Sequence, residues 1–201
     1  MAARPGDLRG EGESQLSARK QGEESLPQFR VVSSKRILRC GFLEVARERA
    51  QGPKNLRIEK HVVKHAGAAA VIARDPNGMV LLIRQYRLPV RQSLWELPAG
   101  RLGAGERPLS AAKRELAEET GYRARAWRKL FVFYPSPGFC DERMTVYLAE
   151  GLTEGQPHPE PYELIRTRWV AWDEALRMVT RGRIKDAKTI AGLLYADTVL
   201  Q

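Results

Sequence analysis

The alternation of apolar and polar positions predicts that the folded part of the chain begins with strands. Residues 56–63 carry apolar side chains on alternate positions, as a strand with one buried face does. Two further expected strands, 35–40 and 43–50, flank a turn signal at Gly41. We therefore expect an N-terminal antiparallel β-structure over residues 31–65.

Short apolar runs continue the strand pattern through the middle of the chain. Residues 66–73 and 79–86 are joined by RDPNG, a sequence that predicts a hairpin. The segment LWELPAG, residues 94–100, predicts another short strand. Further strands are expected at 128–138, 143–152 and 166–172.

Helical spacing first appears after Pro108, a residue that suits the first turn of a helix. Leu109, Ala112 and Leu116 then recur on one face, and Gly121 fits a left-handed C-cap. This pattern predicts one central helix.

Two more helices are expected at the end of the chain, over residues 173–182 and 186–200. Asp173 and Asp186 are their expected N-caps. Together with the strands, these helices predict a mixed α/β domain over residues 66–201.

Three glutamates crowd the central helix within five positions: Glu115, Glu118 and Glu119. At about 100° per residue they share one arc beside the apolar stripe. Like charges that close repel one another, and a hard cation such as Mg²⁺ relieves the repulsion by binding carboxylate oxygens. A solvated charged helix face is the ordinary alternative.

The segment around these glutamates resembles the signature of a known family. Gly100, Glu106 and the run RELAEETGY (114–122) match the Nudix box, G-x5-E-x7-R-E-U-x-E-E-x-G-U, at every specified position. The resemblance implies an α/β fold, a Nudix-like α/β/α sandwich around a mixed β-sheet with the N-terminal antiparallel strands as an extension. It also implies hydrolysis of nucleoside diphosphates linked to another group.

The resemblance further implies a site for Mg²⁺ or Mn²⁺. Family members ligate the metal through glutamates at the places of Glu115 and Glu119, with Glu118 close by, and the carbonyl at Ala99 joins them in the subgroup that this sequence most resembles. Arg114 would orient the glutamates by ion pairing. A metal that bridges pyrophosphate oxygens offsets their charge and lowers the pKa of a bound water.

Features outside the box resemble the ADP-ribose pyrophosphatase group, namely RQYRLPV and LWELPAG before it and a proline, Pro137, at the group's characteristic distance after it. By position, Arg87 would contact the substrate phosphates and Glu96 would contribute to the substrate cleft. Pro137 and Gly138 would lie in a loop beside the terminal ribose. The expected reaction converts ADP-ribose into AMP and ribose 5-phosphate.

The general base is expected in the segment between two late strands, GLTEGQPHPEPYELIRTRWV. Glu163 matches a mobile-loop glutamate that acts as base or extra metal ligand in relatives. Glu160, between two prolines, is its rival, and a base outside both positions is the third possibility.

Partners and compartment follow from charge, cysteines and the resemblance. The net charge of +10 falls entirely outside residues 1–30, which are neutral, polar and aperiodic and are expected to be a disordered tail. The basic residues are scattered, which does not mark a nucleic-acid module. We expect neither a membrane span nor a secretory signal, because residues 1–30 have no apolar stretch and no later run has membrane length. Cys40 and Cys140 are interpreted as free thiols of the cytoplasm, with a single disulfide between them as the alternative. Relatives exchange their N-terminal strands, which implies a homodimer.

Three alternatives to ADP-ribose hydrolysis stay open. Another nucleoside diphosphate sugar, such as GDP-mannose, would suit the same machinery. The basic charge leaves room for an RNA-binding or RNA-decapping protein. A catalytically silent interaction module is the third, although the intact glutamate set argues against it.

Overall fold

The computed structural model describes residues 26–161 and 163–200. Its strands and helices run in the order β1 (Arg30–Cys40), β2 (Leu43–Gln51), β3 (Arg57–Lys64), β4 (Ala68–Ala73), β5 (Met79–Arg87), β6 (Gln92–Glu96), β7 (Ala99–Arg101), α1 (Pro108–Thr120), β8 (Arg123–Phe133), β9 (Met144–Thr153), β10 (Ile165–Ala171), α2 (Trp172–Thr180) and α3 (Ala187–Val199). Short 3-10 turns, η1 (Pro53–Asn55) and η2 (Leu88–Val90), follow β2 and β5.

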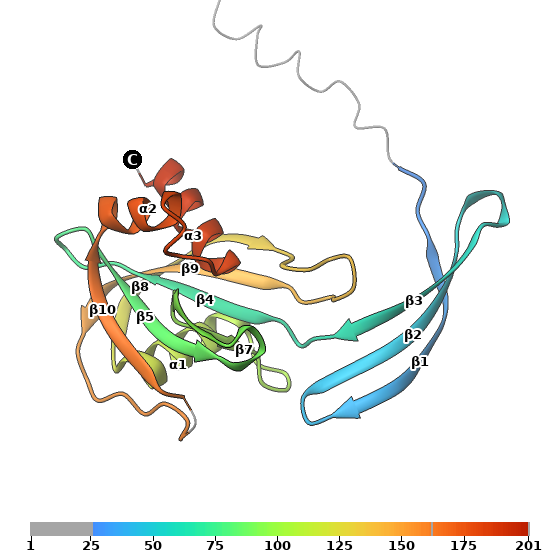
Figure 1. The fold of residues 1–201 in the computed structure, drawn as a ribbon, viewed down its shortest axis with the longest axis horizontal. Coiled ribbons are helices and arrows are strands. Elements are labelled where there is room, and N and C mark those ends of the chain that lie inside the picture. The colour runs from blue at the N-terminus through green and yellow to red at the C-terminus, as the bar shows by residue number, and fades with distance from the viewer. Residues whose placement is uncertain (1–25, 162, 201) are drawn as a thin grey trace, which may run out of the picture.

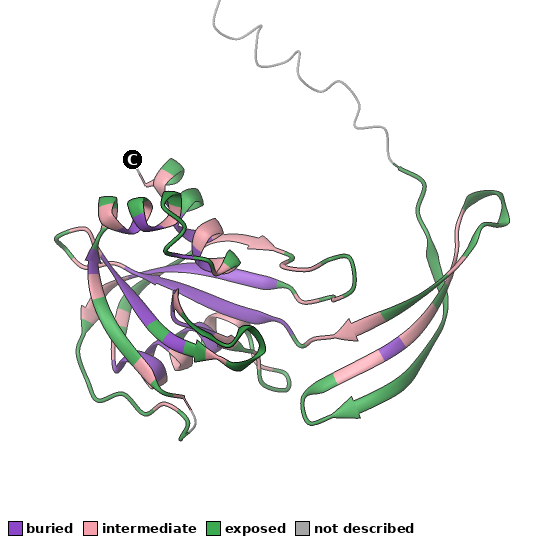
Figure 2. Ribbon diagram, viewed as in Figure 1, coloured by how far each residue is buried: buried purple, intermediate pink, exposed green. Residues whose placement is uncertain are grey.

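The first three strands form an antiparallel sheet of their own, in the order β1-β2-β3. This sheet projects from the body of the molecule, as Figure 1 shows. Every residue of β1 is exposed (Figure 2). The predicted N-terminal extension is therefore confirmed, and its outer strand has an edge without a neighbour among the described residues.

The body is a sandwich of helices around two sheets, ordered β10-β5-β6 and β7-β4-β9-β8. Strands β4 and β9 pair in parallel and the other pairs are antiparallel, so the arrangement is mixed. Helix α1 covers one face, and α2 and α3 cover the other (Figure 1). The predicted α/β/α architecture is confirmed.

Strand β4 lies at the centre and is buried along its whole length. Ala68, Ala70 and Ile72 join the apolar cluster beneath α2 and α3, whereas the alternating residues join the cluster beneath α1. A strand covered on both faces needs a continuous apolar sequence. This explains why AAAVIA shows no polar alternation.

The expected hairpin between residues 66–73 and 79–86 is wrong as a strand pairing. The turn itself forms, because the Asp75 carboxylate accepts the backbone N–H groups of Asn77 and Met79. Beyond one bridge from Arg74 to Val80, however, β4 and β5 enter different sheets. Strand β4 lies between β7 and β9, and β5 pairs with β6 and β10, so each strand takes its neighbours from distant parts of the chain.

The single strand expected at residues 94–100 is wrong, because the segment is divided between two strands. Strand β6 ends at Glu96 and pairs with β5, and β7 starts at Ala99 and pairs with β4. Pro98, between them, has no N–H to donate to a ladder. The break carries the chain from one sheet to the other and separates Glu96 from Ala99.

The central helix agrees with its sequence signals. It starts at Pro108 and ends at Thr120, and Gly121 is its left-handed C-cap with φ +78°. A Cβ at Gly121 would also lie 2.5 Å from the carbonyl oxygen of Gly155, so glycine is favoured there twice.

At the end of the chain, Asp186 caps α3 by accepting the Thr189 N–H at 3.0 Å, as predicted. Asp173 is not the N-cap of α2. The helix starts one residue earlier, after Ala171, and Asp173 lies in its first turn. An acidic side chain there still interacts favourably with the helix dipole.

The remaining structural expectations concern the termini and thiols. The predicted tail over residues 1–30 lies mostly outside the described residues, and β1 begins at Arg30. Cys40 and Cys140 are free thiols. Among the described residues, no helix has the length and apolar character needed to cross a membrane.

Candidate active site

A cleft of about 520 Å³ opens beside the box, between its first residues and helix α1. Helix α1 contributes Arg114, Glu115 and Glu118, and other segments contribute Arg87, Glu160 and Glu163. Most of the residues that the sequence nominated thus meet at one surface, although they come from β5, α1 and the segment before β10.

Arg114 holds three carboxylates on one guanidinium. Its Nε and Nη2 donate to the two oxygens of Glu106 at 3.1 and 3.0 Å, and Nη1 donates to Glu115 at 2.7 Å and Glu118 at 2.9 Å. These hydrogen bonds, foremost those that Arg114 donates to Glu106, raise the pKa of Arg114, so it stays charged. This geometry supports the expected role of Arg114 in orienting the glutamates, which stays a prediction.

Glu119 is almost fully buried, with 3% of its surface exposed. Its position beside the apolar stripe had predicted less burial. Its Oε2 accepts the backbone N–H of Ala99 at 3.0 Å. Burial, reinforced by the charge of Glu115, raises the pKa of Glu119 to about 8. Burial also raises the pKa of Glu115. Both shifts show that negative charge is unfavourable in this pair without a cation nearby.

Gly100 makes room for the Glu115 carboxyl group. A Cβ at position 100 would overlap that group, so any side chain there would displace it. The box glycine is therefore explained by a close approach of a side chain to the backbone.

The donor set suits a hard cation in its chemistry, because it consists of carboxylate and carbonyl oxygens. Arg114 occupies one oxygen of Glu115 and one of Glu118, and Ala99 donates to Glu119. In the described part of the chain, no three acidic, histidine or cysteine side chains already surround a common point for an ion. Ligation by Ala99, Glu115, Glu118 and Glu119 therefore stays a prediction, which the raised pKa values favour.

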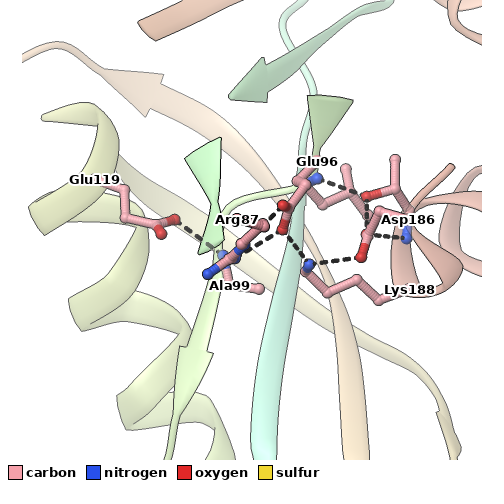
Figure 3. A network of polar contacts seen from close by, with 8 residues as sticks. Arg87, Glu96, Ala99, Glu119, Asp186 and Lys188 are labelled. Carbon is pink, nitrogen blue, oxygen red and sulfur yellow. Dashed lines mark hydrogen bonds and ion pairs between the residues drawn. The ribbon is translucent and has the colours of Figure 1, made fainter. Parts of the chain in front are cut away.

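Arg87 lines the cleft, and Figure 3 shows the carboxylate of Glu96 next to the Arg87 guanidinium. Arg87 donates from Nε and Nη2 to the two Glu96 oxygens, both at 2.8 Å. Glu96 is 1% exposed. Burial acts to raise its pKa, but the Arg87 hydrogen bonds and the charge of Lys188 hold the pKa of Glu96 below its usual value. Glu96 thus acts on the cleft through Arg87, and direct contact with a substrate stays a prediction.

Glu163 and Glu160 both line the cleft, on one turn. The backbone N–H of Glu163 donates to the carbonyl of Glu160, and the Glu160 N–H donates to the Glu163 carboxylate at 3.2 Å. The charge of Glu163 is among the causes that raise the pKa values of Glu115 and Glu119. Glu163 therefore lies within electrostatic range of the box glutamates.

Pro137 and Gly138 lie elsewhere. They line a second groove of about 530 Å³, between the loop after β8 and the N-terminal sheet. A single chain therefore does not bring them together with Arg87. Their expected contact with a substrate stays a prediction.

Sequence reasoning missed an aromatic side chain at the cleft. Phe42, at the tip of the β1–β2 turn, lines it and is 65% exposed. The Arg101 guanidinium carbon lies 3.9 Å from the centre of its ring. An aromatic residue in a predicted turn was a visible signal, but only the tertiary structure brings this turn to the cleft.

Comparison with known proteins agrees with this geometry. The model of the NUDIX domain matches residues 64–193. The chain is 40% identical to an ADP-ribose pyrophosphatase of Mycobacterium tuberculosis, over 85% of this chain and 84% of that protein. It is 34% identical to an ADP-ribose pyrophosphatase of Bacillus subtilis, over 83% and 91%.

Two further likenesses place the fold and widen the range of relatives. A GDP-mannose pyrophosphatase of Yersinia enterocolitica is 37% identical over 65% of this chain and 73% of that protein. The crystal structure of an ADP compounds hydrolase superposes with a TM-score of 0.75 at 18% identity, over 88% of this chain and 96% of that one. The chain belongs to the NUDIX family and is a Nudix pyrophosphohydrolase.

Proposed function

We propose that this protein hydrolyses the pyrophosphate bond of ADP-ribose, with Mg²⁺ or Mn²⁺, to give AMP and ribose 5-phosphate. One observation carries the proposal: a single cleft joins the cation of Arg87 to the carboxylates of Glu115, Glu118 and Glu163. A pyrophosphate is an anion that needs cations on its oxygens. Arg87 supplies one, and the carboxylates are suited to hold the others.

Different residues of the cleft would bind the phosphates and the metal. Arg87 would bind the phosphates through the guanidinium edge that Glu96 leaves free. Glu115, Glu118 and Glu119, with the Ala99 carbonyl, would hold the divalent metal, and Arg114 keeps Glu115 and Glu118 within reach of one another. When bound, the metal offsets the charge on the pyrophosphate and lowers the pKa of a water molecule.

Glu163 would take the proton from the attacking water. It lies at the cleft on a turn outside the box helix, where its carboxylate accepts the backbone N–H of Glu160. Attack of the water oxygen on phosphorus would break the bridging P–O bond, and the departing phosphate would carry its electron pair away. Glu118 would assist from α1.

The nucleoside end would use the exposed ring of Phe42. Aromatic faces stack on nucleobases, and the cation of Arg101 already lies on this ring. Pro137 and Gly138 would reach a substrate only across the second groove. That separation favours a site to which a second copy of the chain contributes.

We propose a homodimer joined through the N-terminal sheet. This sheet carries half-exposed apolar side chains, among them Val31, Ile37 and Leu38, and its β1 edge is open in the described chain. Such an edge and such side chains favour pairing with another chain. Sedimentation of the purified protein should give twice the mass of one 22.7 kDa chain, and a monomer would contradict the proposal. The free thiols Cys40 and Cys140 suit the cytoplasm as the compartment.

We propose ADP-ribose rather than another substrate because the two relatives named for it match more than 80% of this chain. The GDP-mannose pyrophosphatase matches a shorter part of it. The second candidate is therefore a nucleoside diphosphate sugar such as GDP-mannose.

The test is a panel of ADP-ribose, GDP-mannose, a dinucleoside polyphosphate and capped RNA, each with Mg²⁺ and with EDTA. We expect the highest kcat/KM for ADP-ribose, with AMP and ribose 5-phosphate as products and no turnover in EDTA. A higher kcat/KM for GDP-mannose would replace the substrate. Preference for capped RNA would contradict the proposal.

A further inference from the structure

The N-terminus of α3 is fastened to the break between β6 and β7, outside the cleft. The Leu97 N–H donates to the Thr189 hydroxyl at 2.8 Å, and that hydroxyl donates to Asp186 at 2.6 Å. Helix α3 also approaches closely here, because a Cβ at Gly192 would lie 2.8 Å from the Leu97 side chain. The cap of α3 is thus bonded to the residue next to Glu96.

Lys188, in the first turn of this helix, reaches the same carboxylate as Arg87. Its Nζ donates to Glu96 Oε2 and, at 3.0 Å, to Asp186 Oδ1 (Figure 3). The Lys188 side chain is 12% exposed. Figure 3 shows one connected path from the cap of α3 through Lys188 and Glu96 to Arg87.

The way Arg87 and Lys188 share the Glu96 carboxylate determines which Arg87 donors remain for a ligand. Arg87 uses Nε and one N–H of Nη2 on Glu96, so its remaining donors are free for a ligand at the cleft. Without Lys188, Arg87 would be the only cation hydrogen-bonded to the buried Glu96 carboxylate. Its positive charge would then be neutralised by Glu96, and less of it would act on a ligand. Lys188 shares Glu96 Oε2 and fixes the rotation of the carboxylate.

We propose that Lys188 is a positioning residue for Arg87: it holds Glu96 so that the guanidinium is fixed in plane and keeps charge available for the substrate phosphates. The proposal rests on the proposed function of Arg87 as a phosphate ligand. Asp186 supports this arrangement, because it accepts a 3.0 Å hydrogen bond from Lys188 Nζ while its other carboxylate oxygen caps helix α3.

Lys188→Met in the full chain tests this, because Met keeps the length of the side chain and removes its charge. A phosphate contact present in both ground and transition states acts on KM, so we expect KM to rise about tenfold with kcat within about twofold of wild type. Lys188→Arg keeps the charge and should restore KM to within about threefold of wild type. Lys185→Met, an exposed lysine three residues earlier, is the matched control and should leave both constants unchanged.

A double-mutant cycle separates positioning from general stability. Lys188→Met combined with Arg87→Ala should give no higher KM than Arg87→Ala alone, because Lys188 acts through Arg87. An unchanged KM in the folded Lys188→Met variant would overturn the proposal, and so would additive effects in the double variant. If Lys188→Met does not fold, Lys188→Gln carries the same comparison, since its amide can donate to Glu96 without charge.

The substrate for these measurements is the one with the highest kcat/KM on the panel. If ADP-ribose is not hydrolysed but another nucleoside diphosphate compound is, the substrate assignment fails and the KM ratios on that compound still decide the role of Lys188. If ADP-ribose is hydrolysed and the ratios do not change, the role of Lys188 fails alone.

Discussion

The Glu119 carboxylate accepts a 3.0 Å hydrogen bond from the backbone N–H of Ala99, although Glu119 is almost wholly buried. This bond joins the end of α1 to the first residue of β7. The hydrogen bond lowers the pKa of Glu119, but burial and the charge of Glu115 outweigh it and raise the pKa to about 8. The structure thus holds a carboxyl group that is protonated at neutral pH when no cation is near.

The stability of the metal-free protein should therefore fall as the pH rises. A carboxyl group whose pKa is higher in the folded chain than its usual 4.5 stabilises the fold at low pH, and that contribution is lost as the pH rises through about 8. Thermal melts in EDTA from about pH 5 to about pH 9 should show this loss in wild type. Glu119→Gln, which mimics the protonated group, should show a flatter dependence. Equal slopes for the two proteins would contradict the assignment.

Removal of the Glu119 charge should cost activity rather than folding. Glu119→Gln takes one negative charge from a site proposed for a divalent cation, so we expect turnover at saturating Mg²⁺ to fall by about 10²-fold or more. The melting temperature in EDTA should not fall, because the buried charge is unfavourable there. Near wild-type turnover in the purified variant would show that Glu119 is not a metal ligand.

The two glutamates on the turn before β10 form a matched pair for locating the base. Glu163→Gln should lower kcat by roughly 10²-fold or more, and a higher pH should restore part of it, because hydroxide replaces the missing proton acceptor. Glu160→Gln, on the same turn and equally at the cleft, should be near wild type. Both variants are compared at matched Mg²⁺ across pH. A defective Glu160 variant beside an active Glu163 variant would reverse the assignment.

Gly100→Ala tests whether the position of Glu115 matters. The added methyl group would displace the flexible Glu115 side chain rather than backbone, so the melting temperature should change little. Displacement of a catalytic group by about 1 Å can cost about 10²-fold in rate, and we expect a loss of that order in kcat/KM. In a Glu115→Ala background the Gly100→Ala change should add almost nothing. A full additional loss there would mean that Gly100 acts by another route.

Most of the local structure could be predicted from the sequence. The central helix starts at Pro108 and is capped by Gly121 because the fixed φ of proline and the left-handed conformation of glycine are properties of those residues. Asp186 caps α3 for an equally local reason. Asp173 was wrongly expected as the N-cap because the cap lies two residues earlier, at Ala171, a shift within the ordinary variation of helix boundaries.

Pairing between strands could not be predicted in the same way. Residues 66–73 and 79–86 have the turn and the apolar runs of a hairpin, yet β4 pairs with β7 and β9 while β5 pairs with β6 and β10. The break at Pro98 follows from the same rearrangement. Pairing partners depend on residues far away in the chain, and apolar runs carry no information about them.

The site divides along the same line. The sequence by itself determined the box: the crowd of Glu115, Glu118 and Glu119 on one helix arc, and the need for cations that it creates. Only the tertiary structure decided which other side chains meet it. It placed Glu96 next to Arg87, set Lys188 on the same carboxylate, brought Phe42 to the cleft and kept Pro137 in a separate groove. The physical reason is that helix periodicity fixes neighbours three and four residues apart, whereas the packing of α3 joins residues 92 positions apart in the chain, and the packing of the N-terminal sheet brings Phe42 to Arg101.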